Sequence, residues 1–299
     1  MTERSLGLAA MIGACLLWGA TPVYFAPLRA VPIADLIAHR VVWSLALFGI
    51  ILALEGRVGA AFRAIAARAT RLRILAAAAM LALNWLMFFA AILNGHVVQA
   101  SLGYYIYPLA AVLAGTVFFR ERLAPVQMLA LALAALAVLV LTLGLGVTPW
   151  LSLGIAVSFA VYGAVKKGLD LPPRVSVAAE FAVLTPFALA WLAFGPSSPG
   201  APGFGDGAAI TILLIGSSVM TAVPLILFTA AARRVELATL GVLQYLNPTL
   251  QFLSAVLVFG EPFSRWHLIA FSLIWIAVGL WSVAAFGRRR GLPDARAGL

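Results

Sequence analysis

Long apolar runs separated by short polar segments make up almost the entire chain. Nine of the runs contain no Asp, Glu, Lys or Arg, and each is close to or above the roughly 20 residues that a helix needs to cross a bilayer. They lie at 5–28, 74–95, 97–119, 125–146, 147–165, 181–205, 207–232, 237–260 and 266–287. A tenth run, at 33–54, is apolar except for Asp35, His39 and Arg40 near its start. The pattern predicts an all-α polytopic membrane protein with ten transmembrane helices.

Composition supports this class. Of the 299 residues, 64% are hydrophobic and 10% are charged, whereas soluble domains have about 45–50% apolar and about 25% charged residues. The first run is longer than the apolar region of a typical signal peptide and no clear small-residue cleavage site follows it, so we expect it to be retained as a helix. The only cysteine, Cys15, lies inside this run, which leaves no internal disulfide.

The distribution of basic residues predicts the orientation of the chain. The formal net charge is +10, and placing the N-terminus in the cytoplasm puts seventeen of the twenty Lys and Arg residues on that side. Arg29 and Arg265 fall outside, and Arg40 lies within a helix. The positive-inside rule therefore predicts that both termini lie in the cytoplasm. We expect the protein in the bacterial inner membrane. The charge reports orientation, and we expect no nucleic-acid partner.

The segment at 57–73 has the pattern of an amphipathic surface helix. At 100° per residue its apolar side chains share one face and its arginines lie opposite, which favours contact with anionic lipid of the inner leaflet. The alternative is a solvated basic loop. The apolar face comprises Val58, Phe62, Ile65, Ala69 and Leu72, and the basic face comprises Arg57, Arg63, Arg68 and Arg71.

One sequence frame occurs twice. LGYYIYPLAAVLAGTVFFRE begins at Leu102 and LGVLQYLNPTLQFLSAVLVFGE begins at Leu240; in both, a glutamate follows thirteen residues after the proline. The first copy lies on the fourth predicted helix and the second on the ninth, so each half has five helices. Because five is odd, the second half enters the membrane from the opposite side. The matched residues are Gly103 with Gly241, Tyr107 with Tyr245, Pro108 with Pro248, and Glu121 with Glu261.

This frame predicts two inverted repeats, at 1–146 and 147–287, followed by a basic cytoplasmic tail at 288–299. Inverted repeats are typical of secondary transporters, in which the two halves exchange inward and outward shapes. Both prolines lie about eleven residues, or about 16 Å, into their helices, near the bilayer midplane. With the glycines before them, they are candidate hinges where the helix unwinds; simple packing kinks are the alternative. The hinge candidates are Gly103, Pro108, Gly241 and Pro248.

Several longer strings make the sequence similar to a known family. LLWGATPVYF at 16–25, AHRVVWS at 38–44, NGHVVQASLGYYIYPL at 94–109, SFAVYG at 158–163 and TLGVLQYLNPTLQFL at 239–253 resemble the RarD family, in the EamA branch of the drug/metabolite transporter superfamily. The resemblance runs from about residue 6 to 286. It implies two inverted five-helix EamA repeats, with helices 1–4 and 6–9 around a central cavity and helices 5 and 10 outside. RarD proteins are commonly named for chloramphenicol sensitivity, but the resemblance implies no settled substrate.

Two ionisable residues at membrane depth are candidates for function. Arg40 and Glu180 are 140 residues apart and so occupy equivalent positions in the two repeats. An ionisable side chain costs about 2.5–3.5 kcal/mol to insert and needs a partner or a cavity. We expect Arg40 to attract an anionic group or neutralise Glu180, and Glu180 to carry a proton; a structural ion pair is the alternative. His39 is a weaker candidate because it points about 100° away from Arg40.

Neutral polar and aromatic side chains complete the candidate site. Amides at membrane depth can bind a ligand or join helices by hydrogen bonds, and aromatics can line a cavity or belong to the core. The residues that we predict to bind substrate are Trp18, Asn84, Tyr107, Tyr162, Gln244, Tyr245 and Asn247.

The predicted function is a secondary transporter that moves a small amphipathic or zwitterionic metabolite or drug by alternating access. We expect an exporter, with proton coupling as an option. The sequence has no G-x-x-x-x-G-K-[ST] motif for ATP and no H-E-x-x-H motif, so we expect no cofactor and no enzyme activity. A sensor that does not transport, or a channel, is the first alternative, and an intramembrane enzyme is the second. The oligomeric state is left open.

Overall fold

The computed structural model describes residues 2–93, 97–146, 150–196, 200–260 and 265–290. Within these ranges the secondary structure is helical, with no strand. The elements are α1 (Glu3–Gly19), α2 (Thr21–Phe25), η1 (Ala26–Leu28), α3 (Ile33–Leu54), α4 (Gly59–Ala66), α5 (Arg68–Leu93), α6 (Val97–Phe119), α7 (Pro125–Leu145), α8 (Trp150–Lys167), α9 (Pro173–Phe194), α10 (Ala208–Ala232), α11 (Leu237–Leu243), α12 (Leu246–Leu257) and α13 (Arg265–Arg290).

The helices match the predicted crossings in order. Eight segments of the described chain are long and apolar enough to cross a membrane, and the first of them continues from α1 through α2 and η1. The other two predicted crossings correspond to α8 and to α11 with α12. α8 ends in two lysines, and α11 and α12 are too short to count singly. The prediction of an all-α polytopic membrane protein is confirmed, and these elements agree with ten crossings.

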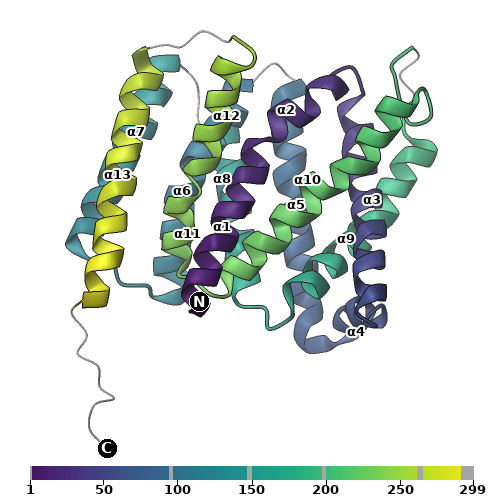
Figure 1. The fold of residues 1–299 in the computed structure, drawn as a ribbon, viewed down its shortest axis with the longest axis horizontal. Coiled ribbons are helices and arrows are strands. Elements are labelled where there is room, and N and C mark those ends of the chain that lie inside the picture. Colours follow the sequence, from purple (N-terminus) through teal and green to yellow (C-terminus); the bar gives the residue numbers. More distant parts are fainter. Residues whose placement is uncertain (1, 94–96, 147–149, 197–199, 261–264, 291–299) are drawn as a thin grey trace, which may run out of the picture.

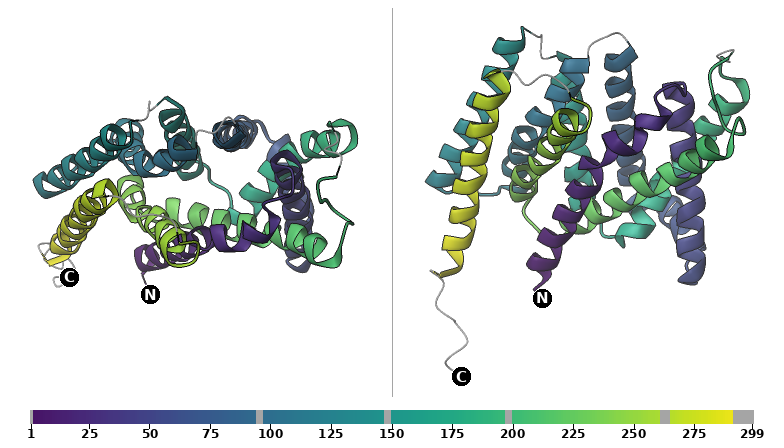
Figure 2. Two further views of the ribbon diagram at one scale, coloured as in Figure 1. Left: turned by 90° about the horizontal axis from the view of Figure 1, so that it is seen from above. Right: turned by 45° about the horizontal axis from the view of Figure 1, so that its top comes forward.

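The two halves of the chain run in opposite directions and interlock. α1 begins and α13 ends at the same end of the molecule, and α1 runs away from that end whereas α8, its counterpart, runs toward it (Figure 1). α8 packs against α5 and α6 of the first half, and α1 packs against α10 and α12 of the second half. These contacts are equivalent under exchange of the repeats. The α7 and α13 helices pair with each other at one side of the bundle (Figure 2), as the resemblance implied.

The two prolines of the repeated frame have different effects. The second copy is interrupted at Gln244 and Tyr245, between α11 and α12. The ring of Pro248 clashes with the carbonyl of the residue four positions earlier, which is Gln244, so the helix breaks there. In contrast, α6 continues through Pro108. The predicted unwinding is therefore present in the second frame and absent in the first.

The frame glycines serve close packing. A Cβ atom at Gly241 would lie 2.8 Å from the carbonyl oxygen of Pro108, so α11 crosses α6 at this point with the backbones nearly touching. A Cβ atom at Gly103 would lie 2.9 Å from Ile155 on α8. Small residues at such crossings allow close helix packing in membranes.

The segment at 57–73, predicted to form one surface helix, is divided between two helices in the structure. α4 ends at Ala66, and a new helix, α5, begins at Arg68, so the expected face from Val58 to Leu72 is divided between two helices. Ala61 and Ala64 form the buried side of α4, which packs against α9. Phe62 and Leu72 remain exposed. The physical reason is that packing of small alanines against a neighbouring helix outweighs a single continuous apolar face.

Candidate functional site

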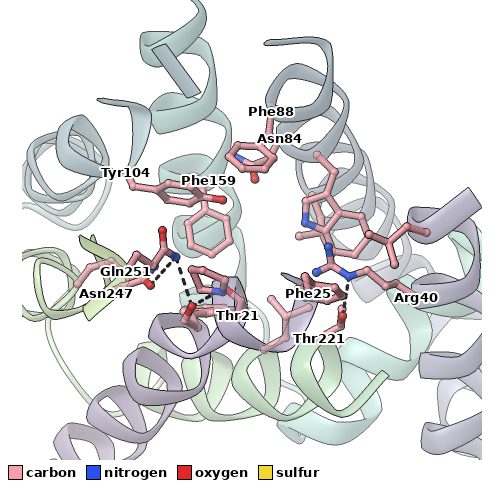
Figure 3. Close-up of a pocket in the computed structure, with 17 residues that line it drawn as sticks. Thr21, Phe25, Arg40, Asn84, Phe88, Tyr104, Phe159, Thr221, Asn247 and Gln251 are labelled. Carbon is pink, nitrogen blue, oxygen red and sulfur yellow. Dashed lines mark hydrogen bonds between the residues drawn. The ribbon is translucent and has the colours of Figure 1, made fainter. Parts of the chain in front are cut away.

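A cavity of about 300 Å³ lies among the helices of both repeats (Figure 3). It is at the small end of the range of roughly 300–1,000 Å³ for small-molecule sites. Its lining is mostly apolar and aromatic, with a few polar groups. The lining residues are Trp18, Thr21, Pro22, Phe25, Leu36, Arg40, Leu81, Asn84, Trp85, Phe88, Tyr104, Phe159, Thr221, Leu225, Gln244, Asn247 and Gln251.

The cavity lies from mid-depth toward the end of the molecule opposite the termini. α3 starts at that far end and contributes Leu36 and Arg40 from its first half. α5 ends there and contributes residues between Leu81 and Phe88 from its second half. α2 also contributes lining residues, and it lies in the part of the first crossing remote from the N-terminus.

Arg40 is the one charged residue of this lining. Its Nε donates a hydrogen bond of 2.9 Å to Thr221 Oγ1 on α10. Its Cζ atom lies 5.2 Å from the ring centroid of Phe25 and 5.2 Å from that of Trp85. Contact with two aromatic faces stabilises a desolvated cation by about 2 kcal/mol or more. Arg40 is thereby held at the wall, with its guanidinium directed into the cavity (Figure 3).

Amide groups form the opposite wall. Gln251 Nε2 donates to Asn247 Oδ1 at 2.9 Å and to the carbonyl oxygen of Trp18 at 3.3 Å. Gln244 lies at the break between α11 and α12, and Asn247 lies in the first turn of α12. The interrupted helix thereby brings both residues to the cavity. Asn84 Nδ2 donates to the carbonyl oxygen of Ile155 at 2.8 Å, which also ties α5 to α8.

Stacked aromatic rings form the floor. Phe159 stacks on Tyr162 with centroids 5.5 Å apart, and Tyr162 stacks on Phe228 at 6.0 Å. Trp18 contacts Phe159 edge-on at 5.9 Å. Phe159 faces the cavity, whereas Tyr162 and Phe228 are fully buried. These rings separate the cavity from the end of the molecule that carries the termini.

A buried ion pair lies beneath the floor. Lys166 on α8 and Glu180 on α9 are both fully buried and their charged groups are in contact. The Tyr162 hydroxyl donates to Glu180 Oε2 at 3.1 Å, and the Ser176 hydroxyl donates to Glu180 Oε1 at 3.3 Å. The expectation that Arg40 neutralises Glu180 is wrong, because each of the two has another partner. Lys166, in the last turn of α8, is one of the residues that sequence reasoning missed.

The spacing of polar residues could have indicated this cluster. Tyr162 and Lys166 are four residues apart on α8, and Ser176 and Glu180 are four apart on α9. Residues at this spacing share a helix face. Two such polar pairs near the connected ends of consecutive helices predict a shared buried network.

The end that carries the termini is closed by polar contacts between the repeats. Glu121, just after α6, accepts hydrogen bonds from the backbone N–H groups of Leu237 and Ala238 at 2.8 and 2.9 Å. Lys167 Nζ lies 3.5 Å from Glu121 and donates to the carbonyl oxygen of Val235 at 2.7 Å. We call this group the Glu121 latch. Glu261 lies outside the described residues.

Further contacts tighten the same end. Arg234 binds Glu3 at 2.8 Å, Arg233 binds Asp170 at 2.9 Å, and Arg174 binds Glu55. Arg73 donates to the carbonyl oxygen of Gly168 at 2.7 Å. Most of these groups are exposed, so each stabilises the closed end by no more than about 1 kcal/mol.

The structure places five predicted binding residues in the cavity lining: Trp18, Arg40, Asn84, Gln244 and Asn247. Tyr162 lies in the floor. Tyr107 and Tyr245 are buried outside the lining, and neither hydroxyl has a hydrogen-bond partner among the described residues. His39 stacks on Phe204 at 5.0 Å, away from the cavity. Sequence reasoning missed most of the aromatic wall and Thr221, because an apolar run does not show which of its residues face inward.

The chain matches one family model and several full-length relatives. Residues 5–143 and 148–283 each match the model of the EamA-like transporter family. An uncharacterized transporter of Pseudomonas aeruginosa is 40% identical over 97% of this chain and 96% of its own. RarD proteins of Escherichia coli and Streptomyces exfoliatus are 36% and 40% identical; the matches cover 95% and 96% of this chain, and 96% and 92% of those proteins.

One solved crystal structure, at 22% identity, covers 95% of this chain and 100% of its own with a TM-score of 0.75, and so supports the fold alone. The fold and the sequence matches show a multi-pass membrane protein of a transporter family, and they indicate a transporter rather than an enzyme. The chain belongs to the EamA-like transporter family and, within it, to the RarD proteins.

Proposed function

We propose that the protein is a secondary carrier that moves a small amphipathic molecule across the bacterial inner membrane by alternating access. Both termini lie on the cytoplasmic side in this proposal, as the distribution of Lys and Arg indicates. The cavity then belongs to a state that faces outward, and the Glu121 latch closes the cytoplasmic end. In the opposite state the latch opens and the aromatic floor parts.

The observation that carries this proposal is the asymmetry of an otherwise symmetric assembly. The contacts of α1 with α10 and α12 are equivalent to those of α8 with α5 and α6. Yet one end holds a cavity and the other holds the floor, the buried ion pair and the latch. Two inverted halves that adopt different shapes can exchange them, which is how inverted repeats produce alternating access.

We further propose outward transport, with Glu180 as the residue that takes up and releases the coupling proton. Three contacts support the choice of Glu180. It is fully buried, it is paired with Lys166, and it is linked through Tyr162 to the ring stack that forms the floor. Opening of the floor would expose this carboxylate to water. Undiminished proton dependence of transport in Glu180→Gln would rule out this role.

The proposal includes anionic lipid as a partner of the surface around α4. Phe62 and Leu72 are exposed beside Arg63 and Arg71, an arrangement that suits the headgroup region of the inner leaflet. Replacing phosphatidylglycerol by phosphatidylcholine in the reconstituted bilayer is expected to lower the thermal stability of the protein, and Arg63→Gln with Arg71→Gln is expected to lessen that difference.

The direct test is flux. A thermal-shift screen of the purified protein against metabolites and antibiotics identifies ligands, because a ligand stabilises the folded state in proportion to occupancy. Uptake of the labelled ligand into proteoliposomes preloaded with unlabelled ligand then shows whether transport saturates and exchanges. Saturable counterflow supports a carrier, non-saturable flux indicates a channel, and binding without flux indicates a sensor.

A further inference from the structure

We propose that the carrier's substrate is a small organic monoanion, whose carboxylate binds the terminal nitrogens of Arg40 while its apolar or aromatic body lies against the rings of the cavity. The inference rests on the proposed carrier function and narrows its substrate class. It excludes a zwitterion or a cation as the preferred ligand.

Charge balance in the cavity is the first support. Among the seventeen lining residues, all of them in the described part of the chain, Arg40 is charged and no Asp or Glu is present. Glu180 lies below the floor in contact with Lys166. The lining therefore carries one positive charge that a monoanion would neutralise, and it offers no carboxylate to hold a substrate ammonium group.

The hydrogen bonding of Arg40 is the second support. A guanidinium has five N–H donors, and the contact described for Arg40 uses the Nε donor, on Thr221. Phe25 and Trp85 contact the guanidinium through their rings, which accept no conventional hydrogen bond. The terminal nitrogens thus face the cavity, and their planar pair matches the two oxygens of a carboxylate.

The opposite wall suggests what else the substrate carries. Asn247 and Gln251 present amide groups across the cavity from Arg40, and Tyr104 lies beside them (Figure 3). Neutral amides suit a hydroxyl, carbonyl or amide group of the ligand. The rings of Trp18, Trp85 and Phe159 supply the surface for its apolar part.

The test compares isosteric probes that differ in charge. Purified protein in phosphatidylcholine nanodiscs is titrated with 3-phenylpropionate, 3-phenylpropanamide, phenylalanine and 3-phenylpropylamine, and with hexanoate, hexanamide and hexylamine. Binding is followed by quenching of tryptophan fluorescence, since Trp18 and Trp85 line the cavity, and by thermal shift. We expect a carboxylate to bind and its amide to bind roughly 10- to 100-fold more weakly, because the charge-assisted hydrogen bonds are lost.

Variants connect this preference to Arg40. Arg40→Gln is expected to lower carboxylate affinity to that of the amide, and Arg40→Lys to give an intermediate value because an ammonium lacks the planar pair of donors. Arg29→Gln is the matched control, since Arg29 is exposed at the end of η1. The comparison of probes on the unaltered protein stands even if Arg40→Gln fails to fold.

The proposal is overturned if an amide, zwitterion or amine binds as tightly as its carboxylate, if neither carboxylate binds, or if Arg40→Gln keeps the preference. It is also overturned if phosphatidylglycerol in the nanodisc displaces the carboxylate, which would make a lipid headgroup the ligand. Carboxylate binding without counterflow would contradict the carrier function and leave the ligand class intact. Counterflow of a neutral tracer that Arg40→Gln leaves unchanged would support the carrier function and contradict the proposed ligand class.

Discussion

Glu180 on α9 and Lys166 on α8 form an ion pair from which water is excluded, and Tyr162 joins that pair to the rings beneath the cavity. Two buried charges satisfy each other only while both are present. The pair therefore couples the positions of α8 and α9 to the state of the floor, and any motion that parts the floor must also change the surroundings of the pair.

This relationship predicts a strongly non-additive response to mutation. Glu180→Gln or Lys166→Met alone leaves an unpaired buried charge or polar group, and we expect each to lower the free energy of unfolding by about 3–5 kcal/mol. The double variant removes both charges and is expected to recover much of that loss. Thermal unfolding of the four proteins in one detergent gives the coupling energy. Additive losses would show that the two charges do not interact.

The close packing around Glu121 predicts that one added methyl group, at Gly115, disturbs the Glu121 latch. A Cβ atom at Gly115 would lie 2.4 Å from Glu121 Oε2 and 3.1 Å from the backbone nitrogen of Ala238. Gly115→Ala should therefore displace the carboxylate and weaken two charge-assisted hydrogen bonds, each of which contributes about 1.5–3 kcal/mol. We expect reduced thermal stability of the closed state and reduced transport.

Gly49→Ala is the control for that experiment. Gly49 lies inside α3, and outside its own helix turn no atom of a described residue lies within 4 Å of where its Cβ would be. The substitution is expected to leave transport unchanged and to raise stability by up to about 1 kcal/mol, because alanine favours helix over glycine. Equal effects of the two substitutions would show that the latch is not responsible.

The three buried tyrosines predicted to bind substrate separate into two kinds. Within the part of the chain that the structure describes, the buried hydroxyls of Tyr107 and Tyr245 have no hydrogen-bond partner, whereas the Tyr162 hydroxyl donates to Glu180. Tyr107→Phe and Tyr245→Phe are therefore expected to be neutral or to stabilise the fold by about 1 kcal/mol, and Tyr162→Phe to destabilise it by about 1.5–3 kcal/mol.

Thermal unfolding of these three variants checks the assignment, with ligand affinity as a second readout. Because Tyr107 and Tyr245 lie outside the cavity lining, their substitution should leave ligand affinity unchanged. A marked loss of affinity in either variant would place its side chain in the binding site after all.

The repeated frame around Pro108 and Pro248 shows what sequence could and could not predict. Residue spacing was enough to predict the inverted halves, because five crossings per copy follow from counting apolar runs. It could not predict that α6 stays continuous at Pro108 while the second copy breaks before Pro248. That difference depends on how neighbouring helices support the backbone, which is a property of packing.

The candidate site was predictable to a similar extent. The cost of inserting charge singled out Arg40, and amides at membrane depth singled out Asn84, Gln244 and Asn247; all four line the cavity. The partner of Glu180 was missed because Lys166 lies at a helix end, where counting along the chain predicts a surface position. In the fold the Lys166 side chain is fully buried, in contact with Ser176 and Glu180 of α9.

Alternating access is tested most directly by the mutual exclusion of two cysteine reporters in a Cys15→Ala protein. Thr21→Cys lies at the cavity, and Ala238→Cys lies buried at the latch. Intact cells and inside-out vesicles are treated with a membrane-impermeant maleimide. The account predicts that Thr21→Cys reacts only from outside and that Ala238→Cys is protected. Adding Glu121→Gln should increase the reaction of Ala238→Cys from the cytoplasmic side and, in the same protein, protect Thr21→Cys. Full reaction of both reporters from opposite sides in the same population would contradict the account and indicate an open pore.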